Sequence, residues 1–564
     1  MSLLALVLVA LSLLLLGYVF YGSRVQKYLD IRDDRVTPAV ALRDNVDFVP
    51  AGRFYLLGQH LSAIAAAGPI VGPILAGLWF GWVPALAWII IGAVFIGGVH
   101  DITALIASVR HKGRSIAEVI RENMSQRSFV LFLAFLWLSL VYIITAFTDI
   151  TASTFVDPQH GSAVASSSMM YLVLAIVMGI ILRVFKMPLA LCTALFLPLV
   201  VVCIYLGRFL PLTCGSLFGL DARTSWNVLL LLYCFIAAVI PVWLLLQPRG
   251  YLGGFFLLAS AGLSFIGIII GGLTGRFEIS YPGFIGWFNT QHLPLFPILF
   301  TTVACGACSG FHALVASGTT SKQLSCERDA RQVGYGGMIL EAVVAIIALS
   351  TLMIVGFPKA NELKDPSLIY ANGIAVFLST FGIDRNFALN FALLAFATFV
   401  YDTLDVATRL GRYIFEEFTG WRGKLSPFIA SFMTLALPFF FVTRKMVDCQ
   451  GNAISTWKVF WTVFGSSNQL LAGFVLFFAA IWLLKNRRQF LFTLIPSLFM
   501  ITVAMVSLCY IIRPYIGIGR CWISLHPIAI TASVLMMLGV LLFLEGIRVI
   551  LKIRKDNRVH LPGA

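Results

Sequence analysis

Long apolar runs alternate with short polar segments along almost the whole chain. A helix needs about 20 apolar residues to cross the hydrocarbon core of a bilayer, and fifteen runs come close to that length. The predicted spans are residues 2–21, 58–80, 83–108, 129–150, 169–185, 188–206, 226–247, 250–272, 294–318, 335–357, 386–408, 425–443, 457–484, 489–512 and 523–550. This pattern predicts an all-α, polytopic membrane helical bundle with about 15 transmembrane helices, organised as a single integral membrane domain over residues 1–564.

Two segments between the spans have predicted roles of their own. Residues 22–57 are predicted to form a cytoplasmic loop. Residues 367–383 are apolar but short, and they contain Asn372, Gly373 and Gly382, so we predict a re-entrant or interfacial helix there. No stretch outside the predicted spans is long enough for a separate soluble domain, which has at least about 50 residues.

Composition narrows the class of protein. The chain of 564 residues is 60% hydrophobic and 12% charged, whereas about 25% of a soluble globular domain is charged. The 47 Phe and 12 Trp exclude a disordered chain, because such chains are poor in apolar residues. The ten Cys are scattered through apolar runs and match neither a disulfide framework nor a zinc site, so we predict no metal.

The net charge of +15 would suggest nucleic acid as a partner if the basic residues clustered on one soluble face. Instead they lie in short loops between apolar runs. With the N-terminus outside, 29 of the 40 Lys and Arg fall on the inner side, as the positive-inside rule requires. We therefore predict an outside N-terminus, a cytoplasmic C-terminus, and a lipid bilayer rather than nucleic acid as the partner.

One predicted span is interrupted by glycine and proline at Gly68, Pro69, Gly72 and Pro73. Each proline removes a backbone donor, so we expect the helix to open there and to free backbone groups. These residues lie about 15 to 22 Å into the span, near the middle of the membrane.

A second interruption lies in the span at 294–318. Its polar and glycine positions are Thr301, Thr302, Gly306, Ser309 and Gly310. Two discontinuous helices that meet near the midplane indicate the substrate site of a secondary transporter. We predict that Gly68 to Pro73 and Cys305 to Gly310 are non-helical and face one another across a central cavity, with hydroxyls from the threonines and Ser309 contacting the substrate. The alternative is that Gly306 and Gly310 form a close helix contact.

Ionisable residues inside predicted spans are the second functional signal, because each is costly unless it is paired or faces a cavity. The ion-coupling candidates are His100, Asp101, His312, Asp402 and Asp405. They could equally form an inner gate.

Structural alternatives exist for several of these residues. Asp405 could form an ion pair with Arg409, one helical turn away. His100 could be a hydrogen-bonded packing residue. Asp149 and Glu341 lie near the ends of predicted spans, and we interpret them as interfacial.

Motifs of ATP-driven pumps and hydrolases are missing from the sequence, which has no Walker loop, no His-Glu-x-x-His and no Gly-x-Ser-x-Gly. We therefore predict a protein that is not an enzyme and uses no cofactor, and whose energy comes from an ion gradient, of either protons or sodium, or from the substrate itself.

Several sequence runs resemble the carbon starvation protein CstA family of bacterial membrane transporters. The resemblance rests on the runs at 43–50, 58–73, 98–101, 304–322, 402–409 and 464–471. It implies a multi-pass transporter of the bacterial inner membrane with a broken-helix inverted-repeat core, as in the amino acid, polyamine and organocation (APC, LeuT-like) superfamily. It also implies uptake of short peptides during carbon starvation, or pyruvate transport by proton symport.

Peptides and pyruvate share a carboxylate, and the amides at the N-terminus of a broken helix suit such an anion. Two other classes stay open: a channel or facilitator for small organic anions, and a membrane-embedded sensor. A flux that saturates and depends on a gradient would argue against the channel.

Overall fold

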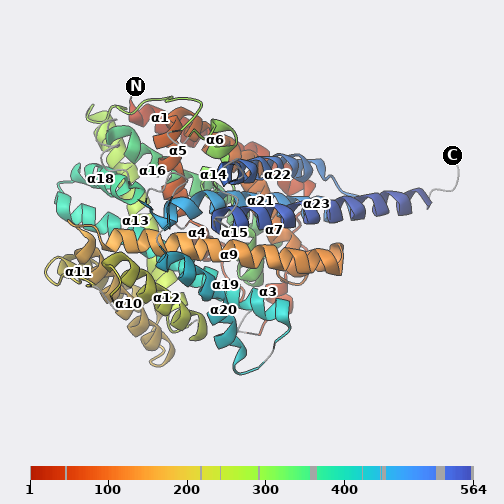
Figure 1. Cartoon of the computed structure of the whole chain (residues 1–564), viewed down its shortest axis with the longest axis horizontal. Coiled ribbons are helices and arrows are strands. Elements are labelled where there is room, and N and C mark those ends of the chain that lie inside the picture. Colours follow the sequence, from red (N-terminus) through yellow and green to blue (C-terminus); the bar gives the residue numbers. More distant parts are fainter. Residues whose placement is uncertain are drawn as a thin grey trace.

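The computed structural model describes residues 2–44, 48–65, 67–215, 219–241, 243–289, 292–355, 365–421, 423–444, 446–447, 453–515 and 527–559. Helices make up nearly all of the regular structure (Figure 1).

The helices are numbered in chain order. In the first half of the chain they are α1 (Leu3–Leu16), α2 (Gly22–Tyr28), α3 (Pro38–Ala41), α4 (Arg53–Ile64), α5 (Gly68–Phe80), α6 (Trp82–Gly92), α7 (Gly98–Arg110), α8 (Ile116–Asn123), α9 (Gln126–Phe155), α10 (Gly161–Arg183), α11 (Leu189–Gly207), α12 (Ala222–Val239) and α13 (Leu246–Leu273). In the second half they are α14 (Leu295–Thr302), α15 (Phe311–Gly318), α16 (Gly336–Val355), α18 (Pro366–Ser379), α19 (Arg385–Thr419), α20 (Ser426–Thr443), α21 (Thr456–Lys485), α22 (Leu491–Ile512) and α23 (Pro527–Val559).

Short π and 3-10 turns extend or join several helices. They are η1 (Gly17–Tyr21), η2 (Ala93–Gly97), η3 (Thr320–Lys322), η4 (Glu327–Asp329), η5 (Arg331–Tyr335) and η6 (Arg513–Tyr515). Because η1, η2 and η5 continue the helical path, three spans become longer than the sequence predicted: Leu3–Tyr28, Trp82–Arg110 and Glu327–Val355.

Helix length and composition account for fourteen of the fifteen predicted spans. Thirteen helices among the described residues are long and apolar enough to cross a membrane, and α4 with α5 forms one further bent span. The remaining predicted span, at 294–318, corresponds to the broken pair α14 and α15. The predicted inverted repeat within this bundle stays a prediction.

A tiny hairpin is the one sheet in the described part of the chain. β1 (Met446–Val447) pairs antiparallel with β2 (Ala453–Ile454), with Met446 opposite Ile454. It lies in the connection between α20 and α21, so the all-α prediction holds for the body of the fold.

The two segments with separate predictions are both partly helical. Of the predicted loop 22–57, residues at its two ends belong to α2 and α4, and α3 lies between them; its cytoplasmic side stays a prediction. Within 367–383, α18 has 14 residues and is therefore about 21 Å long, which is shorter than a bilayer core. It packs against α5, α13, α16 and α19, and its re-entrant or interfacial placement stays a prediction.

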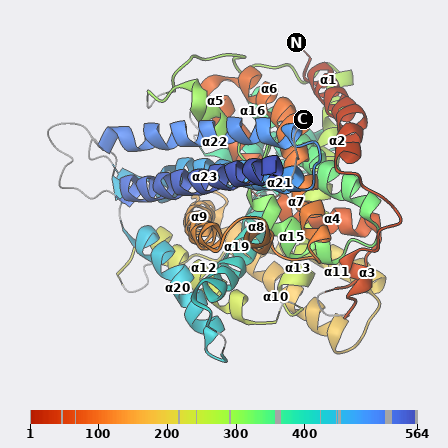
Figure 2. The same cartoon turned by 90° about the vertical axis from the view of Figure 1, so that its right-hand side faces the viewer.

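Three long helices form the centre of the bundle. α9 contacts both α19 and α21, and Figure 2 shows it end-on between neighbouring helices. In the most apolar 18-residue stretch of α19 and of α21, 94% of the residues are buried. The corresponding share is 22% in the span that contains α1 and in α23. Helices buried to this degree can hold polar side chains away from lipid.

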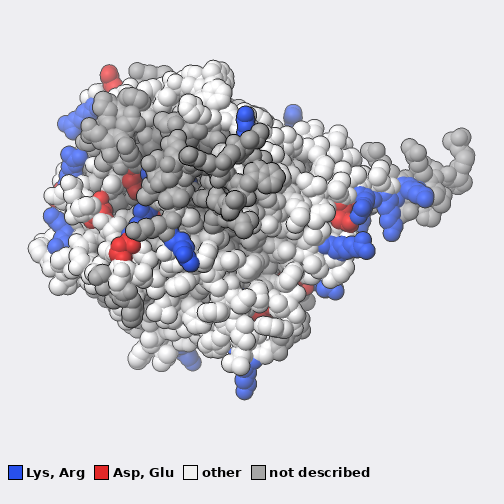
Figure 3. Space-filling view, viewed as in Figure 1, with Lys and Arg blue, Asp and Glu red and all other residues white. Residues whose placement is uncertain are grey.

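The outer surface suits a lipid environment. Large apolar side chains are exposed on the peripheral helices, for example Leu15 on α1, Val201 on α11 and Leu544 on α23. On the face in Figure 3, Lys and Arg gather toward the two ends of the long axis, and the surface between them is largely white where it is not grey. An apolar belt with charges at its ends is the pattern that a bilayer favours.

Candidate functional site

The first broken span consists of α4 and α5, which are bent by 49° relative to each other. α4 ends at Ile64 and α5 begins at Gly68. The prediction that Gly68 to Pro73 is non-helical is therefore wrong, because the break lies just before these residues and Pro69 stands in the first turn of α5. Proline fits there since the first amides of a helix have no intrahelical acceptor, so its missing N–H is not needed.

The second broken span consists of α14 and α15, separated by residues 303–310. The prediction that Cys305 to Gly310 is non-helical is confirmed. Local bonds shape the break, among them one from the amide of Cys308 to the carbonyl of Ala304 at 2.8 Å.

Asn468 on α21 holds the second break in place. Its Oδ1 accepts a hydrogen bond from the amide of Phe311 at 3.0 Å, and its Nδ2 donates to Oγ of Ser309 at 3.0 Å. Its backbone carbonyl accepts from the amide of Gly310 at 3.2 Å. Asn468 therefore caps the N-terminus of α15, a role that sequence reasoning missed because the partners are about 160 positions apart.

The two breaks touch one another directly. A Cβ added to Gly72 would lie 2.6 Å from the carbonyl oxygen of Thr302, and one added to Gly68 would collide with Cys305. The prediction of a central cavity between the two segments is therefore wrong where these residues meet. Glycine has no side chain, so the two backbones approach until they are in contact.

The glycines of the second break pack against different neighbours. A Cβ on Gly306 would lie 2.8 Å from Cβ of Ala345 on α16, whereas one on Gly310 would lie 2.5 Å from Leu471 on α21. The two glycines are not in a helix and do not share one partner, so the alternative of a single close helix contact is also wrong.

The predicted hydroxyls differ in their availability. Thr301 bonds to a carbonyl of its own helix at 3.2 Å and lies 3.3 Å from Oγ of Ser507. Ser309 is bonded to Asn468. The buried hydroxyl of Thr302 has no hydrogen-bond partner in the described part of the protein. Of the three predicted hydroxyls, that of Thr302 is the one left for another ligand.

A buried chain of acidic and imidazole groups lies beside the breaks. Nδ1 of His100 donates to Oδ1 of Asp101 at 2.7 Å, and Nδ1 of His312 donates to Oδ2 of Asp101 at 2.8 Å. Nε2 of His312 lies 3.2 Å from Oε2 of Glu341. All four side chains have 0% exposure. We call these four residues the His–Asp–His–Glu cluster; α7, α15 and α16 supply them.

The interpretation of Glu341 as interfacial is wrong. Helical structure on this span begins at Glu327 rather than near 335, which places Glu341 in the middle of the span. The available signal was a carboxylate inside an apolar run. Next to the cluster, His60 on α4 is buried with Nδ1 2.9 Å from Oγ1 of Thr320.

A second buried cluster surrounds Arg249 on α13. Its Nη2 lies 2.7 Å from Oδ1 of Asp402, and its Nη1 lies 2.7 Å from Oδ2 of Asp405. Tyr233 donates to the same Oδ2 of Asp405 at 2.9 Å. We call Arg249, Asp402 and Asp405 the Arg249 cluster.

The expected pairing of Asp405 with Arg409 is wrong. Nη2 of Arg409 donates instead to the carbonyls of Ala237 and Ile240, at 2.5 and 2.9 Å. The expected pair came from the spacing of four residues, which identifies neighbours on the same helix only. Packing of α13 against α19 instead places Arg249 next to Asp405. The five predicted ion-coupling residues thus fall into two clusters.

Asp149 belongs to neither cluster. It is buried on α9 and pairs with Arg223, whose Nη2 lies 2.6 Å from Oδ2, and it accepts from the amide of Trp457 at 2.8 Å. These fixed partners make it a structural residue that joins α9, α12 and α21.

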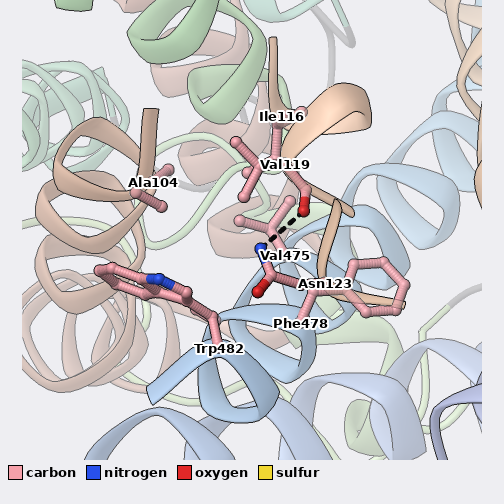
Figure 4. A pocket seen from close by; sticks show the side chains of 9 residues that line it. Ala104, Ile116, Val119, Asn123, Val475, Phe478 and Trp482 are labelled. Atoms are coloured by element: carbon pink, nitrogen blue, oxygen red, sulfur yellow. Dashed lines mark hydrogen bonds between the residues drawn. The ribbon is translucent and has the colours of Figure 1, made fainter. Parts of the chain in front are cut away.

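Two adjoining cavities lie at one end of α7. The smaller, of about 10 Å³, lies between α7, α8 and α21 and has room for about one water molecule (Figure 4). The larger, of about 380 Å³, has a basic lining. Among the described residues, no group of three or more His, Cys, Asp or Glu side chains is arranged to hold a metal ion.

Solved transporter structures resemble the chain weakly. A manganese transporter from Eremococcus coleocola is 15% identical and gives a TM-score of 0.44, with 90% of this chain and 97% of that chain covered. The inward-facing conformation of Mhp1 is 11% identical and gives a TM-score of 0.34, with 90% and 95% covered.

Sequence relatives are closer. The peptide transporter CstA of Campylobacter jejuni is 30% identical over 90% of this chain and 80% of its own length, and that of Helicobacter pylori is 32% identical over 84% and 76%. The pyruvate/proton symporter BtsT of Escherichia coli is 29% identical over 89% and 80%. The family profile described as carbon starvation protein CstA matches residues 2–367 and 358–507. The chain belongs to the carbon starvation protein CstA family.

Proposed function

We propose that this protein is a secondary active transporter of the bacterial inner membrane that imports a small carboxylate-bearing nutrient by proton symport during carbon starvation. Short peptides and pyruvate are the candidate substrates, because relatives are named as a peptide transporter and as a pyruvate/proton symporter. The observation that carries the proposal is the buried His–Asp–His–Glu cluster next to two broken spans.

The charges of this cluster favour a proton as the coupling ion. No Lys or Arg forms an ion pair with Asp101 or Glu341 among the described residues. With both carboxylates ionised and His312 doubly protonated, the cluster has one negative charge in excess, which a single proton removes. Linked carboxylates and imidazoles inside a membrane are typical of proton relays. Sodium would need several oxygen ligands, whereas half of the groups here are imidazoles.

The Arg249 cluster is the second candidate for the proton. Two carboxylates share one guanidinium, so one negative charge is again in excess. Oδ1 of Asp405 is buried and has no hydrogen-bond partner in the described structure, which leaves an oxygen that a proton can occupy.

We assign the carboxylate of the substrate to the first turn of α5, at Gly68 and Pro69. The amide at the start of α15 is already bonded to Asn468, whereas an anion at the start of α5 would meet the positive end of that helix. On the other side of the contact, Thr302 has an unused hydroxyl and is the predicted donor. Because the breaks touch, substrate binding requires α14 and α15 to move away from α5.

The test uses purified protein in liposomes. We expect labelled pyruvate or labelled di- and tripeptides to accumulate under an imposed proton gradient, with saturable kinetics, and not under a sodium gradient alone. Flux that does not saturate and that equilibrates substrate without a gradient would show a channel and would contradict the proposal.

Variants identify the proton-carrying group. Glu341→Gln should abolish accumulation driven by the proton gradient and retain exchange of substrate at equal pH. The matched control is Asp149→Asn, which also removes a buried carboxylate, but one with fixed partners, and should retain accumulation per folded molecule. Asp402→Asn and Asp405→Asn test the second candidate in the same assay. If these three cluster variants all accumulate substrate fully, none of Glu341, Asp402 and Asp405 carries the proton, and the proposal for these groups is wrong.

A further inference from the structure

A basic cavity of about 380 Å³ lies where α7 and α21 end. Its lining includes Arg35, Arg110, His111, Asn123, Trp482 and Arg488. Asn123 and Trp482 also line the small apolar cavity in Figure 4, so the two cavities adjoin.

The arginines around this cavity exceed their acidic partners. Asp30 pairs with Arg32, Arg35 and Arg488 at 2.8 to 2.9 Å. Glu327 pairs with Arg35 at 3.3 Å and with Arg110 at 2.9 Å. Four guanidinium groups therefore share two carboxylates.

Neither carboxylate is part of the lining, which contains Arg35, Arg110 and Arg488. The excess positive charge therefore faces the cavity.

Arg110 is held rigidly at the edge of the cavity. Its Nη2 donates to the carbonyls of Leu29 and Asp30 at 2.7 and 2.9 Å, and its Nε donates to Oε1 of Glu327 at 2.9 Å. The indole ring of Trp482 lies 5.8 Å from its guanidinium carbon. These bonds use Nε and Nη2, and Nη1 makes no hydrogen bond to another described residue, so it can meet a ligand. A guanidinium fixed in this way loses little freedom on binding.

We propose that this cavity is a binding site for a phosphate-bearing anion. Several guanidinium groups that converge from different elements suit the three oxygens of a phosphate, which they can bind through paired N–H donors. The phosphate can belong to an anionic lipid headgroup or to a small soluble molecule. The site does not depend on the transport proposal, because none of its residues belongs to the His–Asp–His–Glu cluster or the Arg249 cluster.

The matched variants are Arg488→Gln and Arg32→Gln. Each removes one ion pair with Asp30, but only Arg488 lines the cavity. The wild type and both variants are purified in dodecyl maltoside, which carries no phosphate. The midpoint of thermal unfolding is then measured against inorganic phosphate and, separately, against phosphatidylglycerol or phosphatidylcholine in mixed micelles.

We expect phosphate to raise the midpoint of the wild type and of Arg32→Gln, and Arg488→Gln to need about tenfold more phosphate for the same shift, as for the loss of one charge-assisted hydrogen bond. A response to phosphatidylglycerol alone, with the same ranking, would assign the site to a lipid headgroup. Equal responses of the two variants, or no response to either ligand, would overturn the proposal. Arg35→Gln provides the same comparison if Arg488→Gln does not fold.

Discussion

Arg249 holds two carboxylates in the interior of the bundle and is itself 1% exposed. Removing one partner of a buried ion pair leaves the other charge buried and unpaired, which destabilises the fold strongly. Replacing both partners by apolar residues costs much less. The same principle applies to Asp149 with Arg223. In contrast, the His–Asp–His–Glu cluster contains no fixed positive charge, so its protonation can change without leaving an unpaired guanidinium.

The role of Arg249 is tested by comparison with Arg409. Arg249→Met leaves two buried carboxylates without a cation and should lower stability by about 3 to 5 kcal/mol. Arg409→Met removes hydrogen bonds to carbonyls and should cost about 1 to 3 kcal/mol. Unfolding in detergent measures both, and Asp405→Asn added to Arg249→Met should restore part of the loss. The opposite ranking would favour Arg409 as the partner.

Acid sensitivity is expected at Asp30, which lies outside the spans. The hydrogen bond from Arg32, followed by that from Arg488, lowers the pKa of Asp30 below its usual range. A carboxylate with a lowered pKa in the folded state stabilises the fold above its unfolded pKa of about 3.9 and loses this contribution as the pH falls. The wild type should therefore exceed Asp30→Asn in stability at neutral pH, and the difference should shrink below about pH 4. Thermal unfolding across this range measures it, and a difference that is constant with pH would contradict the assignment.

At the scale of elements, the two broken spans are positioned by close contacts between helices. α5 lies against the end of α14 through Gly72, and α21 lies against α14 through Gly465, which faces the carbonyl of Thr301. Asn468, one turn further along α21, caps α15. α21 therefore fixes both halves of the second break, and the break in turn places His312 beside Asp101.

The contact between α5 and α14 is tested by adding one methyl group. Gly72→Ala would place a Cβ 2.6 Å from a backbone oxygen and should cost about 1 to 3 kcal/mol through overpacking. The control is Gly58→Ala on α4 of the same broken span, where nothing lies within 4 Å; there alanine should stabilise the helix by about 0.5 to 1 kcal/mol. The test compares the thermal unfolding of both variants with that of the wild type. Equal changes in stability would contradict the close contact between α5 and α14.

At the scale of the whole molecule, α13 and α19 pack in opposite directions. Arg249, near the start of α13, meets Asp402, while Phe256, further along α13, meets Phe391, earlier on α19. The end of α13 and the end of α19 must then lie on opposite sides of the bundle. The residues that follow α13 and those that follow α19 should therefore face opposite sides of the membrane, and their accessibility tests the predicted topology.

Thiol labelling tests which side each position faces. Thr274 follows α13 and Gly423 follows α19, and both residues are exposed. With the N-terminus outside, a membrane-impermeant thiol reagent should label Thr274→Cys in intact cells and should label Gly423→Cys only after lysis. The unsubstituted chain provides the background from its own cysteines, and labelling in the reverse order would contradict the orientation.

The sequence by itself determined the membrane class, most of the spans and which two spans are interrupted. Apolar length and proline or glycine positions are local properties, and a bilayer imposes the same requirement on every segment. It also identified His100, Asp101 and His312 as unusual, because an ionisable side chain in an apolar run is visible without knowledge of its partner.

Only the tertiary structure decided which groups meet. Arg249 rather than Arg409 pairs with Asp405, Glu341 lies in the middle of its span beside His312, and Asn468 caps a helix far away in the sequence. The first break lies before Gly68 because Pro69 suits the first turn of a helix, and the two breaks touch because glycines allow it. Each of these facts depends on the packing of separate helices, which local periodicity does not encode.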